Sequence, residues 1–291
     1  MSVDLLHDRI RRFKNPLIVD FGILPDELPP HLLEQEGSFC KAYHRFCREL
    51  LEELKDAVAG VRFRFQSFAL LGAEGISALQ DCLNFAKELG YFVLLDSPQI
   101  LSAGDGIRVA NAVFDEKNYP CDGLLFSAYI GSDAMKPMLS YCKDEDKSIF
   151  VLLRSANKSA WELQDLLSGS RHVYSAAAEM VSRHGEQLIA KCGYAKVCGV
   201  VGANAADPTR MLRTKHNRMF LLVDGLDESG SNTKNAAAAF DRFGFGAAVN
   251  AAACVTAAWK DAEADSTEYL AAARQAVDRI KKNIGRYITI L

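Results

Sequence analysis

Charged side chains stand at the ends of short apolar runs in this sequence, where they could share one site. Asp20 and Asp96 each end such a run, and Arg62 and Arg64 alternate with apolar residues in another. A buried carboxylate can serve as a general acid or base, and a neighbouring arginine can bind an anion or stabilise developing negative charge. The plainer alternative, which we favour, is that these acids and arginines pair with one another as a salt-bridge cluster.

Further residues occupy equivalent positions along the chain. They are Pro98, Ser127, Arg154, Asn157, Asn204, Asp224 and Asn250. From the whole set, Arg64, Asn157, Asp20 and Asn250 are the candidates for contacting a ligand. The acids of the set, together with Asp227, could hold a divalent cation, but no ligand spacing specifies one, so we predict no metal and no cofactor. None of the six histidines ends an apolar run, so a histidine general base is not expected.

The elements that must position these residues recur along the whole chain. Eight β-rich runs are each followed by a helix-length stretch, and the runs are Pro16–Gly22, Val61–Phe65, Tyr91–Ser97, Gly123–Ala128, Ser148–Ser155, Lys196–Asn204, Arg218–Gly225 and Gly246–Ala252. Most are continuously apolar, as strands covered on both faces are. This alternation predicts an α/β fold, a (β/α)8 TIM barrel formed by residues 1–291 as one domain, with its chemistry at the C-terminal ends of the strands. An open doubly wound sheet is the alternative, but it usually carries GxGxxG after its first strand, and that motif is missing here.

Helical periodicity fills most of the intervals between the predicted strands. The expected helices are Phe39–Ala57, Glu74–Leu89, Asp133–Lys143, Tyr174–Cys192, Thr233–Arg242 and a closing helix Ser266–Ile284. Ser132-Asp133 and Asp207-Pro208 are plausible places for helix N-caps.

Composition argues against several classes of partner. The net charge of −3 over 291 residues gives no basic patch for a nucleic-acid backbone or an anionic membrane surface. No apolar run is long enough to span a bilayer, and the first residues do not have the form of a signal peptide. The eight cysteines include no CxxC pair, which indicates scattered buried thiols in a reducing cytoplasm.

Several stretches of the sequence are informative when they are read in order. They are Gly72-Ala-Glu-Gly75, Ala128-Tyr-Ile-Gly-Ser-Asp133, Arg154-Ser-Ala-Asn157, Val200-Val-Gly-Ala203, Val223-Asp-Gly225 and Ala248-Val-Asn250. Together they resemble the longer bacterial (type 2) subfamily of orotidine 5′-phosphate decarboxylases. The resemblance covers nearly the whole chain. It implies a barrel that removes the C6 carboxylate of orotidylate without metal or cofactor, by means of an alternating Lys-Asp-Lys-Asp array.

The residues that the resemblance assigns to catalysis are mostly replaced in this sequence. The first lysine falls on Arg62, and the Asp-x-Lys-x-x-Asp motif reads Asp96-Ser-Pro-Gln-Ile-Leu101, so only Asp96 matches. The proton-donating lysine thus falls on Pro98, and the aspartate that reaches across a dimer interface falls on Leu101. Proline has no ammonium group and no backbone N–H to donate a proton.

The positions that would bind the nucleotide are replaced as well. The acid that contacts the ribose falls on Gly22, and the serine that contacts the pyrimidine falls on Ala156. The two phosphate ligands fall on Ser229, in the loop after the seventh predicted strand, and on Ala253, after the eighth. The first of these loops is acidic and includes Asp227 and Glu228. Carboxylates in that loop would repel a phosphate dianion.

Three functional hypotheses follow. We favour a non-catalytic homologue, kept as a binding or assembly protein; the alternatives are an enzyme with altered chemistry at the barrel mouth, and a residual orotidylate decarboxylase with a displaced acid such as Lys136 or Lys158. The resemblance also implies a homodimer through the loops at the barrel mouths. A nucleotide-like small molecule remains a candidate ligand, although its phosphate site is degraded.

Overall fold

The computed structural model describes residues 2–115, 117–227, 232–260 and 265–291. Eight parallel strands close into a barrel in the order β1-β10-β9-β8-β5-β4-β3-β2. Their bounds are Leu17–Asp20 (β1), Gly60–Arg64 (β2), Phe92–Asp96 (β3), Gly123–Ser127 (β4), Ser148–Arg154 (β5), Ala195–Gly202 (β8), Met219–Asp224 (β9) and Ala247–Ala251 (β10). All eight predicted runs are therefore strands, and the predicted (β/α)8 barrel is confirmed. A separate antiparallel pair, Leu167–Ser168 (β6) and Arg171–His172 (β7), lies in the segment between β5 and α8.

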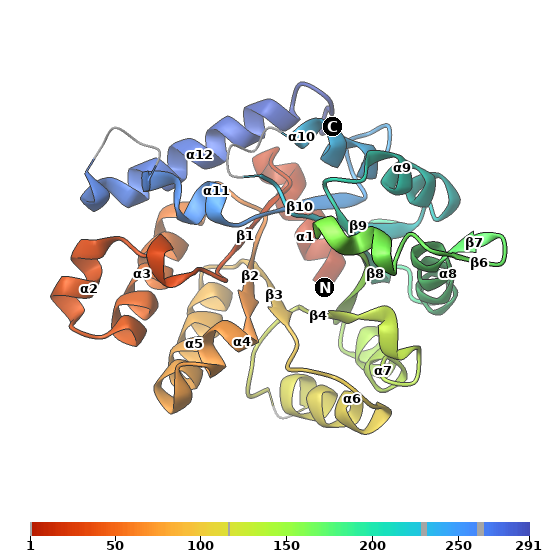
Figure 1. Ribbon diagram of the computed structural model, residues 1–291, viewed down its shortest axis with the longest axis horizontal. Helices are drawn as coiled ribbons and strands as arrows, with labels where there is room; N and C mark the ends of the chain where they lie inside the picture. The colour runs from red at the N-terminus through yellow and green to blue at the C-terminus, as the bar shows by residue number, and fades with distance from the viewer. Residues whose placement is uncertain (1, 116, 228–231, 261–264) are drawn as a thin grey trace.

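Helices lie around the strands, most of them on the outside of the ring (Figure 1). Their bounds are Ser2–Phe13 (α1), Pro30–Glu36 (α2), Phe39–Leu54 (α3), Phe65–Ala69 (α4), Gly72–Glu88 (α5), Ala103–Ala110 (α6), Lys136–Asp144 (α7), Val173–Gly185 (α8), Ala206–Lys215 (α9), Thr233–Ala236 (α10), Ala253–Thr256 (α11) and Tyr269–Ile284 (α12). Alternate strand residues face opposite ways, so each strand supplies one set of side chains to the helices and another to the interior.

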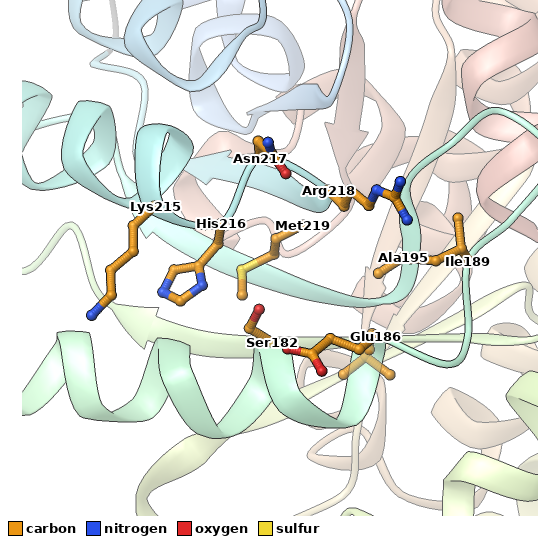
Figure 2. Close-up of a pocket in the computed structure, with 11 residues that line it drawn as sticks. Ser182, Glu186, Ile189, Ala195, Lys215, His216, Asn217, Arg218 and Met219 are labelled. Carbon is orange, nitrogen blue, oxygen red and sulfur yellow. The ribbon is translucent and has the colours of Figure 1, made fainter.

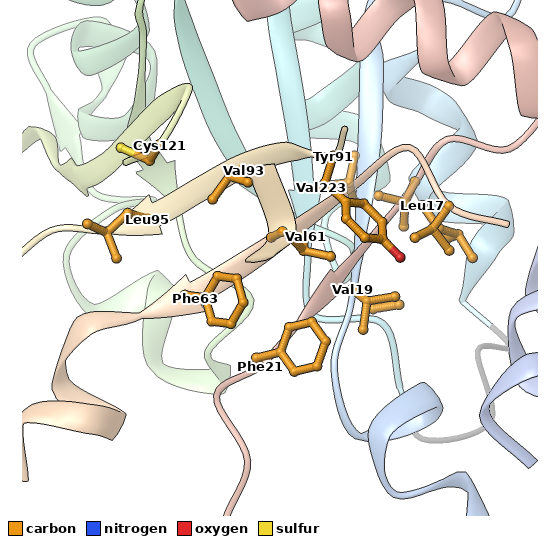
Figure 3. Close-up of a cluster of buried hydrophobic side chains, with 14 of the residues drawn as sticks. Leu17, Val19, Phe21, Val61, Phe63, Tyr91, Val93, Leu95, Cys121 and Val223 are labelled. Carbon is orange, nitrogen blue, oxygen red and sulfur yellow. The ribbon is translucent and has the colours of Figure 1, made fainter. Parts of the chain in front are cut away.

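The outward-facing set forms the larger core. On β1, β2 and β3 it includes Val19, Val61, Phe63, Val93 and Leu95, all of which are buried in one apolar cluster (Figure 3). The inward-facing set forms a second cluster, which contains Ile18, Phe92, Leu94, Phe150, Val200, Phe220 and Leu222. The interior of the barrel is thus packed with side chains, as in other barrels of this size.

Helix α1, which the sequence analysis did not predict, packs on this inner cluster. Val3, Leu6 and Ile10 from α1 are buried in it. Arg9 anchors the same helix: its guanidinium donates to the carbonyls of Ala59, Gly90, Lys55 and Val58. Because these carbonyls lie near the N-terminal ends of β2 and β3, α1 is fixed to that end of the barrel.

Two predicted helix starts were placed wrongly. Helix α7 begins at Lys136, with Pro137 in its first turn, and the backbone N–H of Lys136 bonds to the carbonyl of Ser132. Helix α9 begins at Ala206, so Asp207 and Pro208 lie within the first turn and do not cap it. Proline has its φ fixed near the helical value and lacks an N–H, so it suits the first turn of a helix.

Two predicted helices are also shorter than their periodicity indicated. Helix α8 ends at Gly185, and Ile189 forms a bridge with Ala195 at the entry to β8. Helix α10 covers only Thr233–Ala236 and continues as a 3-10 turn to Ala239, whose carbonyl accepts a hydrogen bond from Arg213. Tertiary contacts end both helices where local propensity would have continued them.

All eight cysteines are free thiols, six of them buried, as their scatter in the sequence predicted. Among the residues that the structure describes, no helix is long and apolar enough to cross a membrane.

Candidate functional site

The charged residues at the strand ends all face the inside of the barrel. Asp20 on β1 lies beside Arg62 on β2, and Arg64 on β2 lies beside Asp96 on β3, because these pairs are in register across adjacent strands. Asp20 lies two positions after the interior residue Ile18, and Asp96 lies two positions after Leu94, so the pleat turns both inward. Arg62 and Arg64 are in register with these acids and face the same way. The predicted location of these side chains at the C-terminal mouth is confirmed.

Arg62 is the centre of an ion cluster that fills this mouth. Its Nε and Nη2 donate to the two carboxylate oxygens of Asp96 at 2.7 and 2.8 Å, and its Nη1 donates to Asp224 at 3.0 Å. The same Nη1 lies 3.4 Å from a carboxylate oxygen of Asp20. The side chain of Arg62 is only 5% exposed, and that of Asp20 is fully buried. We call Asp20, Arg62, Arg64, Asp96 and Asp224 the mouth cluster.

Arg64 and Asn250 also contact Asp20. Arg64 donates to both carboxylate oxygens of Asp20, with the shortest distance 2.7 Å from Nη2. Asn250 donates from its amide nitrogen to Asp20 at 2.9 Å and to Asp224 at 2.8 Å. These two contacts fix the orientation of the amide, since the reverse orientation would point its oxygen at two carboxylates. Two arginines thus face three carboxylates, which leaves one net negative charge when all are ionised.

The electrostatics of the mouth cluster are those of mutually compensating buried ions. Burial disfavours the charge of Arg62, but Asp20, Asp96 and Asp224 outweigh that effect and raise its pKa well above the ordinary value. Burial also raises the pKa of Asp96, against the opposing influence of Arg62. For Asp224 burial acts in the same direction, but the charge of Arg62 prevails and lowers its pKa. Removal of Arg62 would therefore leave buried carboxylates without their main counter-ion.

Gly22 and Arg64 are sterically linked. A Cβ atom at position 22 would lie 2.2 Å from Cδ and 2.4 Å from Nε of Arg64. The arginine side chain therefore passes through the space that any side chain at position 22 would need. Ala156 and Gly225 are linked in the same way, because a Cβ at position 225 would lie 2.2 Å from Cβ of Ala156.

Arg154 takes part in a separate ion pair beside the mouth cluster. Its guanidinium donates to both carboxylate oxygens of Asp165 at 2.7 and 2.8 Å and to Asn204 at 3.2 Å. The hydrogen bond from Arg154 lowers the pKa of Asp165 despite partial burial. This pair ties the segment after β5 to the loop after β8, and it leaves the Arg154 side chain only 11% exposed.

The remaining predicted residues lie outside these networks. Asn157 is exposed at the start of a 3-10 turn, and no side-chain contact brings it to the mouth cluster within the described ranges. Leu101, in the loop after β3, is 68% exposed, and Pro98 is half-buried in the same loop. Ala253 begins α11 after β10. Ser229 and Glu228 lie outside the described residues.

Sequence reasoning left two important partners off its candidate site. Asp224 was identified as a strand end and a possible cation ligand but not as a partner of Arg62, although that pairing makes it a full member of the mouth cluster. Its position as the last residue of β9 was the signal that could have placed it. Asp165 lies in an irregular segment with no periodic signal, so its pairing with Arg154 could not be inferred. The part of the chain that the structure describes contains no group of three or more acidic, histidine or cysteine residues placed to hold a metal ion.

Comparison with curated proteins identifies relatives along nearly the whole chain. The orotidine 5′-phosphate decarboxylase of Clostridium novyi is 25% identical over 287 residues, which are 98% of this chain and 99% of that protein. The orotidine 5′-phosphate decarboxylase of Rhodopirellula baltica is 28% identical over 271 residues, 90% of each chain. No family model matches the sequence.

Solved structures of orotidine 5′-monophosphate decarboxylases superpose on this chain. The Leishmania donovani OMP decarboxylase superposes with a TM-score of 0.73 at 24% identity, and the superposition covers 97% of this chain and 100% of the Leishmania chain. The Plasmodium berghei orotidine 5′-monophosphate decarboxylase gives a TM-score of 0.74 at 16% identity, covering 97% and 98%. At these identities the structures establish the shared fold.

Proposed function

The chain is a homologue of the orotidine 5′-phosphate decarboxylases along nearly its whole length, and from that premise we propose that it is a non-catalytic member kept as a binding or assembly protein. One observation carries the proposal: Arg62, 5% exposed and bound to three carboxylates, occupies the centre of the mouth where these barrels do their chemistry. An arginine so held is a structural ion. Three of its five N–H groups donate to Asp96 and Asp224, and at 5% exposure the side chain is nearly inaccessible to a substrate.

The residues around Arg62 also lack the proton donor that the resemblance calls for. Pro98 stands at the position of the acidic lysine, and Leu101 stands at that of the second aspartate. The displaced lysines that could replace them lie on the surface. Lys136 pairs with Asp133 and has a side chain that is 57% exposed, and Lys158 is exposed as well. A reaction that needs about 20 kcal/mol of transition-state stabilisation would have to proceed here without its acid and its charge array.

The shape and charge of the mouth argue against the nucleotide itself. Arg64 fills the space in which an acid at position 22 would contact a ribose. The mouth cluster carries one net negative charge, so it would repel both the carboxylate and the phosphate of orotidylate. Loss of a charge-assisted arginine contact to phosphate alone weakens binding by about 1.5–3 kcal/mol.

A direct assay tests the proposal. We expect no release of CO2 from orotidylate above the buffer rate, while the Clostridium novyi relative, assayed in parallel, serves as the control. We also expect no shift in the unfolding temperature with 1 mM uridylate. A ligand at about one hundred times its Kd would stabilise the native state by about 2.7 kcal/mol, which is a rise of several degrees. Turnover, or a clear thermal shift, would revive the decarboxylase alternative.

An enzyme with altered chemistry is the second candidate, and one observation favours it. Asp96 has a pKa raised by burial and a side chain that is 18% exposed, so it is the member of the mouth cluster best placed to exchange a proton. Its two oxygens both accept from Arg62, however, and these contacts oppose its protonation. A screen of small carboxylic acids for CO2 release, repeated with Asp96→Asn, separates this candidate from a non-catalytic protein.

We extend the proposal to the assembly and setting of the protein. Residues 1–291 would act as one domain, because α1 and α12 pack on the barrel that the strands between them close. Two copies would pair through the loops at the mouths, where Leu101 presents an exposed apolar side chain in place of an acid. Free thiols throughout are consistent with a reducing cytoplasm.

A further inference from the structure

A cavity of about 300 Å³ opens at the end of the barrel opposite the mouth cluster. It lies between the last turn of α8, the end of α9 and the first residues of β8 and β9 (Figure 2). Its walls combine apolar side chains with polar and charged ones. The apolar residues are Ile189, Ala195, Val197 and Met219.

His216 supplies a buried polar group that points into this cavity. The residue is 9% exposed, and its Nε2 atom has no hydrogen-bond partner within the described ranges. Figure 2 shows the imidazole between Lys215 and Met219, directed toward Ser182 on α8. Burial, assisted by the charge of Lys215, lowers the pKa of His216, so the ring is neutral near pH 7 and one nitrogen can accept a hydrogen bond. A buried acceptor of this kind is normally matched by a donor from protein, water or ligand.

The cavity also has one unpaired charge of each sign. Arg218 stands just before β9 and Glu186 just after the last residue of α8, on opposite sides of the cavity. Neither forms an ion pair with another residue in the described part of the chain. Lys215, by contrast, is occupied by Glu179. The free charges are therefore a guanidinium, which suits a carboxylate, and a carboxylate, which suits an ammonium group.

We propose that this cavity binds a small α-amino acid, with the carboxylate at Arg218, the ammonium group at Glu186 and Nε2 of His216, and the side chain against the apolar wall. A zwitterion satisfies both free charges and the unpartnered nitrogen at once. A simple anion would leave Glu186 facing it, and a simple cation would do the same with Arg218. The volume is at the lower end of the range for ligand sites, which favours a short side chain such as that of valine.

Titration of the full chain with three matched probes tests the assignment. L-Valine, isobutyrate and isobutylamine share the apolar part and differ in which charges they carry. We monitor the imidazole NMR signals of the six histidines and assign that of His216 by its loss in His216→Asn. Valine should shift the His216 signal saturably, and the two singly charged probes should bind at least about tenfold more weakly.

Matched variants locate the charges. Arg218→Gln and Glu186→Gln should each weaken valine binding by about tenfold or more, a change equivalent to 1.4 kcal/mol. Arg183→Gln removes the same charge from an exposed residue of α8 outside the cavity and should leave binding unchanged. Thermal unfolding of every variant reports whether it is folded.

Four results would overturn the proposal. They are the absence of a saturable shift with valine, which would leave Nε2 to water; equal binding of isobutyrate, which would make this an anion site; equal binding of isobutylamine; and an equal loss in Arg183→Gln. If Arg218→Gln does not fold, Glu186→Gln and the probe series decide the question without it.

Discussion

Replacing Arg62 with methionine tests whether the mouth cluster holds the C-terminal end of the barrel together. Methionine keeps an apolar stem of similar reach but removes the guanidinium. That group donates two hydrogen bonds to Asp96 and one to Asp224, and it lies 3.4 Å from Asp20. The variant would leave three carboxylates with Arg64 as their only arginine partner in the mouth cluster.

The expected loss follows from the balance of two large effects. Hydrogen bonds to charged groups contribute about 1.5–3 kcal/mol each, so the three bonds of Arg62 have a gross value of about 4.5–9 kcal/mol. Part of that gain is offset in the native protein by the cost of removing the Arg62 guanidinium from water, and the methionine variant does not have this cost. Measured removals of one partner from a buried ion pair cost about 3–5 kcal/mol, and we expect Arg62→Met to fall in that range at pH 7.

Urea unfolding at several pH values provides the measurement. Without Arg62 the buried carboxylates should have raised pKa values. Their protonation should therefore raise the free energy of unfolding of the variant as the pH falls toward about 5. The deficit relative to the native protein should therefore shrink in acid. Arg108→Met is the matched control: its side chain is 78% exposed and pairs with Asp105 on the surface, so the loss should be about 0–1 kcal/mol. A loss for Arg62→Met no larger than for the control, or a deficit independent of pH, would refute the reasoning.

Three further predictions concern stability and assembly. Arg9→Met should lower the free energy of unfolding by about 3 kcal/mol, because four carbonyls lose a charged donor; urea unfolding checks it, and a loss below 1 kcal/mol would contradict it. Asp224 has a pKa lowered mainly by Arg62 against burial, so its stabilising charge should be present at neutral pH and lost as the pH falls below about 4; the stability difference from Asp224→Asn should vanish there. Leu101→Asp should weaken a homodimer in sedimentation at tens of micromolar. A native protein that is monomeric at that concentration, with a binding free energy weaker than about −6 kcal/mol, would contradict the dimer proposal.

The barrel was predictable because its signal repeats. Each strand is an apolar run, and eight runs alternating with helical stretches leave few topologies for a parallel sheet. The position of Asp20 and Asp96 at the mouth followed from the same pattern, since chemistry in such barrels gathers at the C-terminal ends of strands. Their pairing with Arg64 and Arg62 was expected as one of two alternatives, and the structure has both pairs.

What sequence could not supply was information about contacts between distant segments. Helix α1 was missed because contacts with distant segments stabilise it. Its apolar face covers the inner cluster, and Arg9 donates hydrogen bonds to carbonyls 46 to 81 residues away. The early end of α8 at Gly185 has the same origin, because a Cβ there would lie 3.0 Å from that of Ala195. Asp165 depends on the path of an irregular segment, for which a single sequence gives no periodic signal.

The substitutions at the mouth are physically dependent on one another, and this bears on how the proposed loss of catalysis could be reversed. An acid introduced at position 22 would collide with Arg64. Moving Arg64 would leave Asp20, fully buried, with Arg62 as its only arginine, and Arg62 is already shared between Asp96 and Asp224. Changing Arg62 to lysine would replace a planar fork that binds Asp96 through two nitrogens with a single ammonium group. Each single return toward the decarboxylase pattern therefore breaks a buried ion pair before it restores a catalytic contact. We accordingly expect no single substitution at Gly22, Arg62 or Arg64 to produce orotidylate decarboxylation; one that did so in a folded protein would show that the mouth cluster is not what prevents it.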